Sequence, residues 1–76
     1  MHIKTNLDTM AFFEEVDRCR DEVLLHSAEG DVLNLKSELC RLIFSVIVTK
    51  EKLREKVWIV CTDAEDQDRM QRFMEE

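Results

Sequence analysis

The chain has 76 residues, of which 45% are hydrophobic and 37% are charged, with one Gly and no Pro. This composition predicts a single small globular domain over residues 1–76 and excludes both a second domain and a disordered chain. A domain of this size buries only about 60% of the surface that its unfolded chain exposes, which leaves little core for an enclosed catalytic pocket. With 11 basic and 17 acidic residues the net charge is −6, so DNA, RNA and anionic membranes are poor partners.

The sequence carries no pattern typical of a membrane or secreted protein. The longest apolar stretch, residues 42–48, is interrupted by Ser45 and is far shorter than the ~18 residues of a membrane span. Residues 1–8 show no basic region followed by an apolar segment, so we expect no secretory signal and a cytoplasmic location. The odd number of widely spaced cysteines fits neither a disulfide framework nor a zinc site. We expect reduced, mostly buried thiols at Cys19, Cys40 and Cys61.

The N-terminal part of the chain predicts a short strand and a helix. Residues 2–5 are a brief β-branched segment, typical of an edge strand. Asp8 is placed to cap a helix expected over residues 9–20, with Leu7 and Phe12 as its hydrophobic staple. The face of this helix that we expect in the core carries Phe12, Phe13, Val16 and Cys19.

The middle of the chain predicts a β-hairpin and a second helix. Two β-rich runs, residues 23–28 and 32–35, flank Gly30, which is the only glycine and therefore the residue best suited to a positive φ in a hairpin turn. Ser37 is expected to be the N-cap of an amphipathic helix that begins at Glu38. The apolar stripe of this helix, which we expect in the core, is Leu39, Leu42, Ile43, Val46 and Ile47.

The C-terminal part predicts one strand and a third helix. Residues 50–56 are a mixed-charge run, expected to be a solvated helical extension or a loop, and residues 57–62 alternate as a strand. Thr62 and Glu65 form a capping-box pattern, which predicts a helix from Asp63 to the C-terminus. The resulting order, β-α-β-β-α-β-α, predicts an α+β fold with three helices on one face of a four-stranded antiparallel sheet.

The sheet face away from the helices is expected to be apolar. If Val57, Ile59 and Cys61 face the helices, Trp58 and Val60 face outward. We expect Leu25 or Val23 on the neighbouring strand to join them. Such a patch predicts an interface with a protein partner or with a second copy of the chain. The alternative is that Trp58 belongs to the core, with the strand register reversed.

Two segments resemble HPr, the histidine-containing phosphocarrier of the bacterial sugar phosphotransferase system. The run Val32-Leu33-Asn34-Leu35-Lys36-Ser37, which follows Glu29-Gly30, resembles the stretch around the regulatory serine of HPr. The passage from Val57 to Ala64-Glu65 is similar to the last strand of HPr and the turn into its final helix. The order of elements matches as well, so the resemblance implies the HPr fold, an open-faced β-sandwich.

The sequence departs from HPr where the phosphocarrier chemistry would lie. In HPr a histidine followed by Ala-Arg-Pro begins the first helix, and this chain has Asn6-Leu7-Asp8-Thr9 at that place. Asp8 would repel a phosphoryl group instead of holding it. The residue after the regulatory serine, apolar in HPr and used to contact partners, is Glu38.

Three further features have both a functional and a structural interpretation. Ser37 is a candidate regulatory phosphorylation site, because a helix N-terminus stabilises phosphate, or it is simply a cap. His2 and His26 have no partner at catalytic spacing and are interpreted as surface or packing residues. Acidic residues at the start of the last helix complement its dipole, so we expect no metal there. These residues are Asp63, Glu65, Asp66 and Asp68.

We therefore expect a non-catalytic HPr-like regulatory or protein-interaction module, with no catalytic residue and no cofactor. One alternative is a degenerate phosphocarrier in which another residue, such as His2, carries phosphate. The other is a small subunit of a larger complex with an unrelated βαββαβ fold. Strand order distinguishes that fold from HPr, which places its first and last strands side by side, with the last also beside the second.

Overall fold

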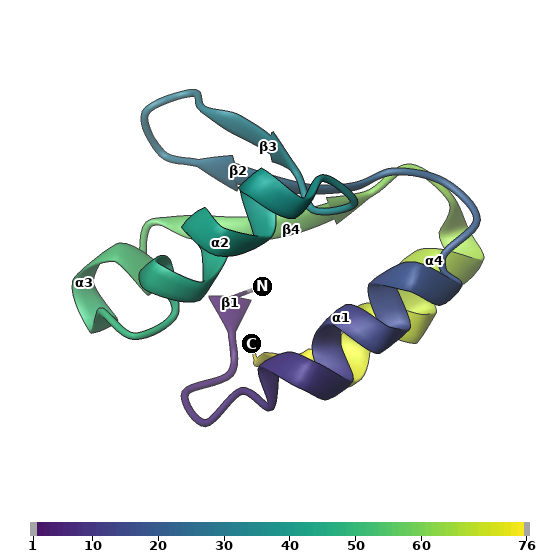
Figure 1. The fold of residues 1–76 in the computed structure, drawn as a ribbon, viewed down its shortest axis with the longest axis horizontal. Helices are drawn as coiled ribbons and strands as arrows, with labels where there is room; N and C mark the ends of the chain where they lie inside the picture. The colour runs from purple at the N-terminus through teal and green to yellow at the C-terminus, as the bar shows by residue number, and fades with distance from the viewer. Residues whose placement is uncertain (1, 76) are drawn as a thin grey trace.

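The computed structural model describes residues 2–75, which form an α+β domain with the element order β-α-β-β-α-α-β-α and a final short strand. Figure 1 labels these elements along the chain. The first half contains β1 (His2–Ile3), α1 (Thr9–Arg18), β2 (Val23–Ser27), β3 (Val32–Asn34) and α2 (Glu38–Ile47). The second half contains α3 (Glu51–Arg54), β4 (Val57–Cys61), α4 (Ala64–Met70), the 3₁₀ turn η1 (Gln71–Phe73) and β5 (Met74–Glu75).

The sheet has three antiparallel strands in the order β3-β2-β4, not the four that we expected. The first strand, β1, lies beside β4 but pairs with β5 instead, with Ile3 opposite Met74. Ile3 is buried, and the amide of Lys4 donates to the carbonyl of Phe73 at 3.0 Å. The chain after α4 thus gives β1 a hydrogen-bonding partner that the sequence pattern did not reveal.

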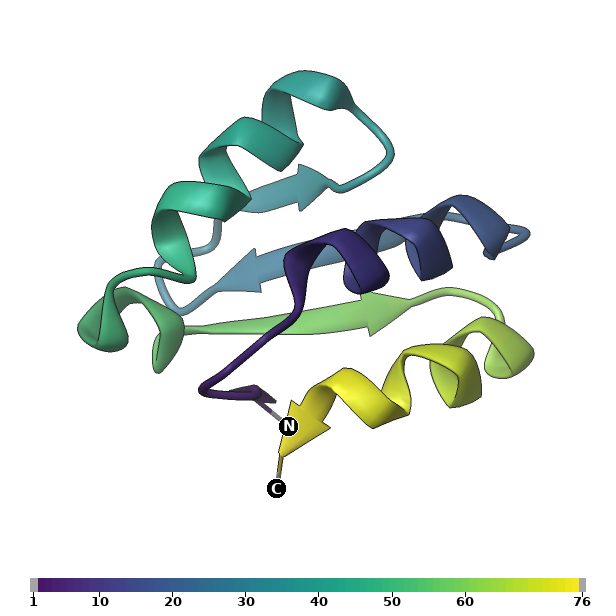
Figure 2. The ribbon, with the colours of Figure 1, turned by 60° about the horizontal axis from the view of Figure 1, so that its bottom comes forward.

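The helices pack on one face of this sheet. Figures 1 and 2 show α1 and α2 over the same face, with α4 beside α1 near β4. The rings of Phe12 and Phe44 stack with centroids 4.9 Å apart, and Phe73 meets Phe12 edge-on at 5.3 Å. These rings join α1, α2 and the C-terminal turn in one core. None of the helices within residues 2–75 has the length and apolar character needed to cross a bilayer.

Local signals in the first half of the chain are confirmed. Asp8 is the N-cap of α1, where its carboxylate accepts from the amide of Ala11 at 3.1 Å. The helix ends at Arg18, two residues earlier than expected, because Cys19 is already extended. Gly30 has a φ of 93° in the hairpin turn, the conformation for which we expected a glycine.

The second helix begins at Glu38 as expected, but the apolar stripe predicted for the core faces outward. Phe44 is fully buried, whereas Leu42 is 68% exposed. Of the predicted stripe, only Ile47 packs against the core, as a partly buried residue. Phe44 decides the orientation because its large ring stacks on Phe12. Ser37 occupies the N-cap position, but its side chain makes no capping hydrogen bond.

The helix that was predicted from Asp63 to the C-terminus, α4, also differs from its prediction. It begins at Ala64 with Asp63 at the N-cap position, so the expected capping box from Thr62 does not form. The fully buried carboxylate of Asp66 anchors this helix instead, since it accepts two backbone amides from the loop after α1. The helix stops at Met70, and the chain then turns so that Met74 is buried against β1.

Candidate interaction site

The most exposed apolar surface of the described chain lies on α2. Four residues on one side of this helix are 41% to 68% exposed, although all four are large and aliphatic. We call them the outer α2 face: Leu39, Leu42, Ile43 and Val46. A surface helix normally turns such residues toward its own core. An apolar face left in water is therefore a candidate binding surface.

The outer α2 face is also uncharged. Within residues 39–49, Arg41 is the one charged residue, and its side chain is bound by other residues of the same chain. Its Nε donates to the carbonyl of Leu35 at 2.7 Å, and its guanidinium forms an ion pair with Asp17. The guanidinium carbon also lies 4.9 Å from the centre of the Phe13 ring. The hydrogen bond from Arg41 lowers the pKa of Asp17, which keeps the pair charged.

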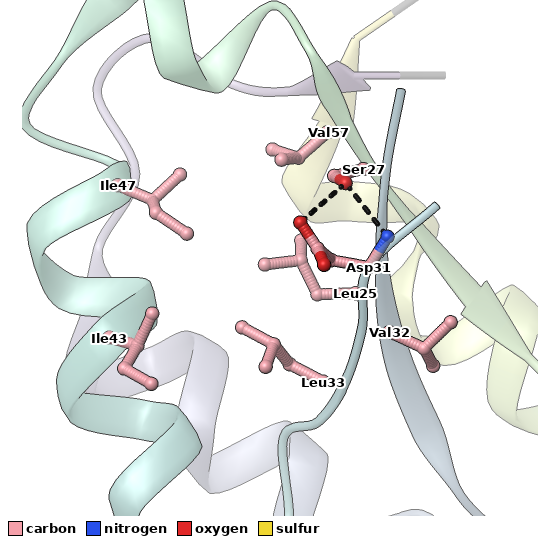
Figure 3. Close-up of a pocket in the computed structure, with 8 residues that line it drawn as sticks. All are labelled: Leu25, Ser27, Asp31, Val32, Leu33, Ile43, Ile47 and Val57. Carbon is pink, nitrogen blue, oxygen red and sulfur yellow. Dashed lines mark hydrogen bonds between the residues drawn. The ribbon is translucent and has the colours of Figure 1, made fainter. Parts of the chain in front are cut away.

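A groove adjoins this face on the side of the hairpin. It consists of two neighbouring pockets of about 290 and 270 Å³, which share Ser27, Asp31, Ile47 and Val57. Figure 3 shows Ile43 and Ile47 of α2 on one wall, opposite Leu33 and Leu25. Toward the solvent, the hydroxyl of Ser27 accepts from the amide of Asp31 at 3.1 Å and donates to its carboxylate at 3.3 Å. The lining is mostly apolar and can hold apolar side chains of a partner.

Ser37 lies at the N-terminal end of α2, beside the outer α2 face. Its amide donates to the carbonyl of Asn34 at 3.0 Å, and its carbonyl accepts from the amide of Arg41 at 3.0 Å. The residue is exposed and its hydroxyl makes no capping hydrogen bond. The backbone of Ser37 therefore contributes to the turn into α2, while the hydroxyl is accessible.

The open face of the sheet differs in part from its prediction. Trp58 and Val60 lie on this face and are partly buried, and the expected strand register is confirmed. Val23 and Leu25, however, are 0% and 2% exposed and belong to the core. Leu25 pairs with Ile59, and directly paired residues share one face of a sheet, so these two positions cannot join Trp58.

The neighbours of Trp58 and Val60 on β2 are His26 and Leu24. His26 pairs with Trp58, and the two rings lie with centroids 6.1 Å apart at an interplanar angle of 25°. The Nε2 atom of His26 is buried without a hydrogen-bond partner among the described residues. Leu24 pairs with Val60 and is partly buried. The aromatic and aliphatic side chains on this face thus cover one another more than those on α2 do.

The N-terminus of α1 is occupied by an acidic group. Asp8 uses one carboxylate oxygen to accept from the amide of Ala11 in the first turn of this helix. His2 lies in β1, and its Nδ1 is 3.3 Å from the carbonyl oxygen of Val57. The structure therefore holds this histidine against β4, and not in the first turn of α1.

Three carboxylates from separate parts of the chain meet near the start of α4. One oxygen from each of Asp21, Asp63 and Asp66 lies within 4.8 Å of the others. The sequence singled out the last two together with Glu65 and Asp68, but it missed Asp21, which is distant along the chain. Asp66 accepts from the amides of Arg20 and Asp21 at 3.0 and 2.9 Å. Its role is to hold α4 against the loop that follows α1.

The three cysteines are free thiols. Cys19 and Cys61 are buried and Cys40 is partly buried. Burial raises the pKa of Cys61 to about 11 and also raises that of Cys19. Both buried thiols are therefore protonated at neutral pH, which makes them poor nucleophiles.

Comparisons with protein-family models, with curated proteins and with solved structures find no match for this chain. The outer α2 face is the feature that sequence reasoning missed. A signal for it was present, because the apolar residues of this helix cover two of its sides and only Glu38, Arg41 and Ser45 are polar within residues 38–47. The inner ones are Cys40, Phe44, Ile47 and Val48. Two apolar stripes on one helix indicate a helix that is covered on both sides.

Proposed function

We propose that this chain is a non-catalytic, HPr-like regulatory or protein-interaction module that does not carry phosphate on a histidine. The HPr-like fold is supported by part of the strand order, since β4 pairs with β2 and lies beside β1, although β1 forms its hydrogen bonds with β5. The helices on one face of the sheet and the Gly30 hairpin support it as well.

The observation that carries the proposal is the outer α2 face. Leu39 and Leu42 are each about two-thirds exposed, whereas the other leucines of residues 2–75, apart from Leu53 at 41%, are buried or partly buried. Monomeric proteins seldom leave adjacent large apolar side chains in water unless something binds them. The neighbouring groove, with Ile47 and Val57 in its lining, extends the surface available to a partner.

A photo-crosslinking residue in place of Leu42, introduced into the chain in its own cells, tests the interaction. We expect discrete protein adducts from this position and none from the same residue at Asp68, which is exposed on α4. The mass of each adduct distinguishes a second copy of the chain from another protein. A chain that forms no adduct from position 42 would contradict the proposed interaction function.

The absence of phosphocarrier activity has a separate test. The Asp8 carboxylate already accepts from the first turn of α1 and would repel a phosphoryl group. We therefore expect no acid-labile label on the chain after incubation with the first enzyme of the phosphotransferase system and labelled phosphoenolpyruvate. Acid-labile label on His2 would establish the degenerate phosphocarrier instead.

Ser37 supplies the regulatory part of the proposal. Its hydroxyl is accessible and has no capping bond to lose on modification. A phosphate on it would place a dianion at the positive end of α2, beside Leu39. We expect Ser37→Asp to weaken crosslinking from position 42, while Ser37→Asn, which is similar in size and neutral, leaves it unchanged. Equal yields from the two variants would remove Ser37 from the mechanism.

A further inference from the structure

We propose that the outer α2 face binds the same face of a second copy of this chain, with the two helices antiparallel across a two-fold axis. The proposal rests on the interaction function proposed above and names its partner. It is carried by three properties of the face: its lack of charge, the spacing of its residues and its area.

The lack of charge defines the chemistry of the partner. Leu39, Leu42, Ile43 and Val46 carry no charge, and Arg41 is held by Leu35 and Asp17 of its own chain. A strongly acidic or basic partner would lose hydration at this surface without gaining an ion pair. The face matches a partner that is itself apolar and helical, and the outer α2 face of another copy has these properties.

The spacing of the four residues is the same when it is read in either direction. The steps along the helix are three, one and three residues, so a two-fold axis between positions 42 and 43 superimposes the pattern on itself. Leu39 then meets Val46 of the second copy, and Leu42 meets Ile43 of the second copy. Antiparallel packing of two copies of α2 (Glu38–Ile47) also places opposite ends of the two helix dipoles side by side.

The exposed apolar area is sufficient for the apolar part of a homodimer interface. The exposed fractions of the four residues correspond to about 400 Å² of apolar surface, and Val32 and Leu53 at the groove raise this to about 550 Å². A standard interface buries about 800 Å² on each chain, of which about 65% is apolar in homodimers. The patch thus supplies the apolar part of one ordinary dimer interface, with polar side chains around it left for the rim.

The test is the mass of the purified full chain in solution, measured by analytical ultracentrifugation from about 1 to about 500 μM. We expect a dimer at the high end of this range. Leu42→Lys should be monomeric throughout, because it places two like charges beside the two-fold axis. Asp68→Asn makes the same change in net charge on α4 and should dimerise as the unmodified chain does. Far-UV circular dichroism checks that each variant is folded, which we expect because Leu42 is 68% exposed.

A mixing experiment tests the contact itself. Leu42→Lys and Leu42→Glu should each be monomeric alone, and their equimolar mixture should form a heterodimer, because the axis brings the two positions together. Failure of the mixture to associate would overturn the two-fold arrangement.

Two further outcomes would also overturn the proposal. One is a dimer that persists in Leu42→Lys but dissociates in Trp58→Lys, which would assign self-association to the open face of the sheet. The other is an unmodified chain that stays monomeric at every concentration. If position 42 still crosslinks to another protein in cells, that second outcome leaves the proposed interaction function intact and rejects only the second copy as its partner.

Discussion

The orientation of α2 can be tested by comparing one residue on each side of the helix. Phe44 is fully buried and stacks on Phe12, with ring centroids 4.9 Å apart. Phe44→Leu removes about three buried carbons and this ring contact, so the free energy of unfolding should fall by about 2 kcal/mol. Leu42 is 68% exposed, and Leu42→Ala should change the same quantity by less than about 0.5 kcal/mol in the monomer.

Urea denaturation, followed by the fluorescence of Trp58 and by circular dichroism, measures both losses. A domain of 76 residues is stable by about 4–11 kcal/mol, so Phe44→Leu should still fold, whereas the cost of about 3–5 kcal/mol for Phe44→Ala could unfold it. The protein must be dilute enough to have the mass of one chain, because dimerisation would add a concentration-dependent term. If Leu42→Ala lowers the free energy of unfolding as much as Phe44→Leu does under these conditions, the stripe that contains Leu42 faces the core and the orientation described for α2 is wrong.

Three further predictions follow from individual side chains. Asp8→Ala should lower the free energy of unfolding by about 1 kcal/mol, because Asp8 caps α1. Ser37→Ala should lower it by only about a few tenths of a kcal/mol, because the Ser37 hydroxyl makes no capping bond. Equal losses for the two variants in urea titrations would contradict this difference. Burial opposes the ionisation of Asp66, but the two backbone amides that donate to it, together with the charges of Arg69 and Lys36, lower its pKa from the usual 3.8. The stability that this carboxylate confers should be full above pH 3.8 and lost as the pH falls through its lower pKa in the folded state. In parallel acid titrations, the unmodified chain should lose its stability advantage over Asp66→Asn in this range, and a difference that does not change with pH would contradict the assignment. With its pKa raised to about 11 by burial, the thiol of Cys61 should react with a maleimide only after unfolding, so a reaction rate unaffected by urea would show that it is accessible in the fold.

The elements that the sequence predicted well depend on neighbouring residues. The carboxylate of Asp8 needs only the first turn of α1 to form its cap, and Gly30 needs only a tight turn between two strands. The alternation of β4 likewise predicted that Trp58 and Val60 lie together on the face away from the core. Each signal is local, so it acts wherever the rest of the chain lies.

The features that the sequence could not predict depend on residues far apart in the chain. Val23 and Leu25 were placed on the wrong face because alternation within one strand does not reveal which residue of the next strand it pairs with. The pairing of β1 with β5 joins the two ends of the described chain and has no local pattern. Asp66 was interpreted through its own helix, whereas the amides that it accepts come from the loop after α1.

The candidate site escaped prediction for a different reason. A helix with one apolar stripe has one possible orientation, but α2 is apolar on both sides. The choice between the stripe of Leu42 and the side of Phe44 depends on the aromatic rings that α1 contributes to the core. The presence of two apolar sides made the orientation of α2 ambiguous in the sequence. It also creates the candidate site, because the second apolar side remains exposed once the first is packed in the core.

Because α2 is anchored through its inner side, the residues that stabilise the fold are different from those of the outer α2 face. Arg41 and Phe44 fasten the helix to α1, and neither contributes to the outer α2 face. Substitutions on the outer side can therefore accumulate with little effect on folding, so evolution or an engineer could exchange one binding specificity for another at this position. A chain with little core to spare could gain an adaptable surface in this way, since the residues of the proposed binding surface are not the residues that hold the domain together.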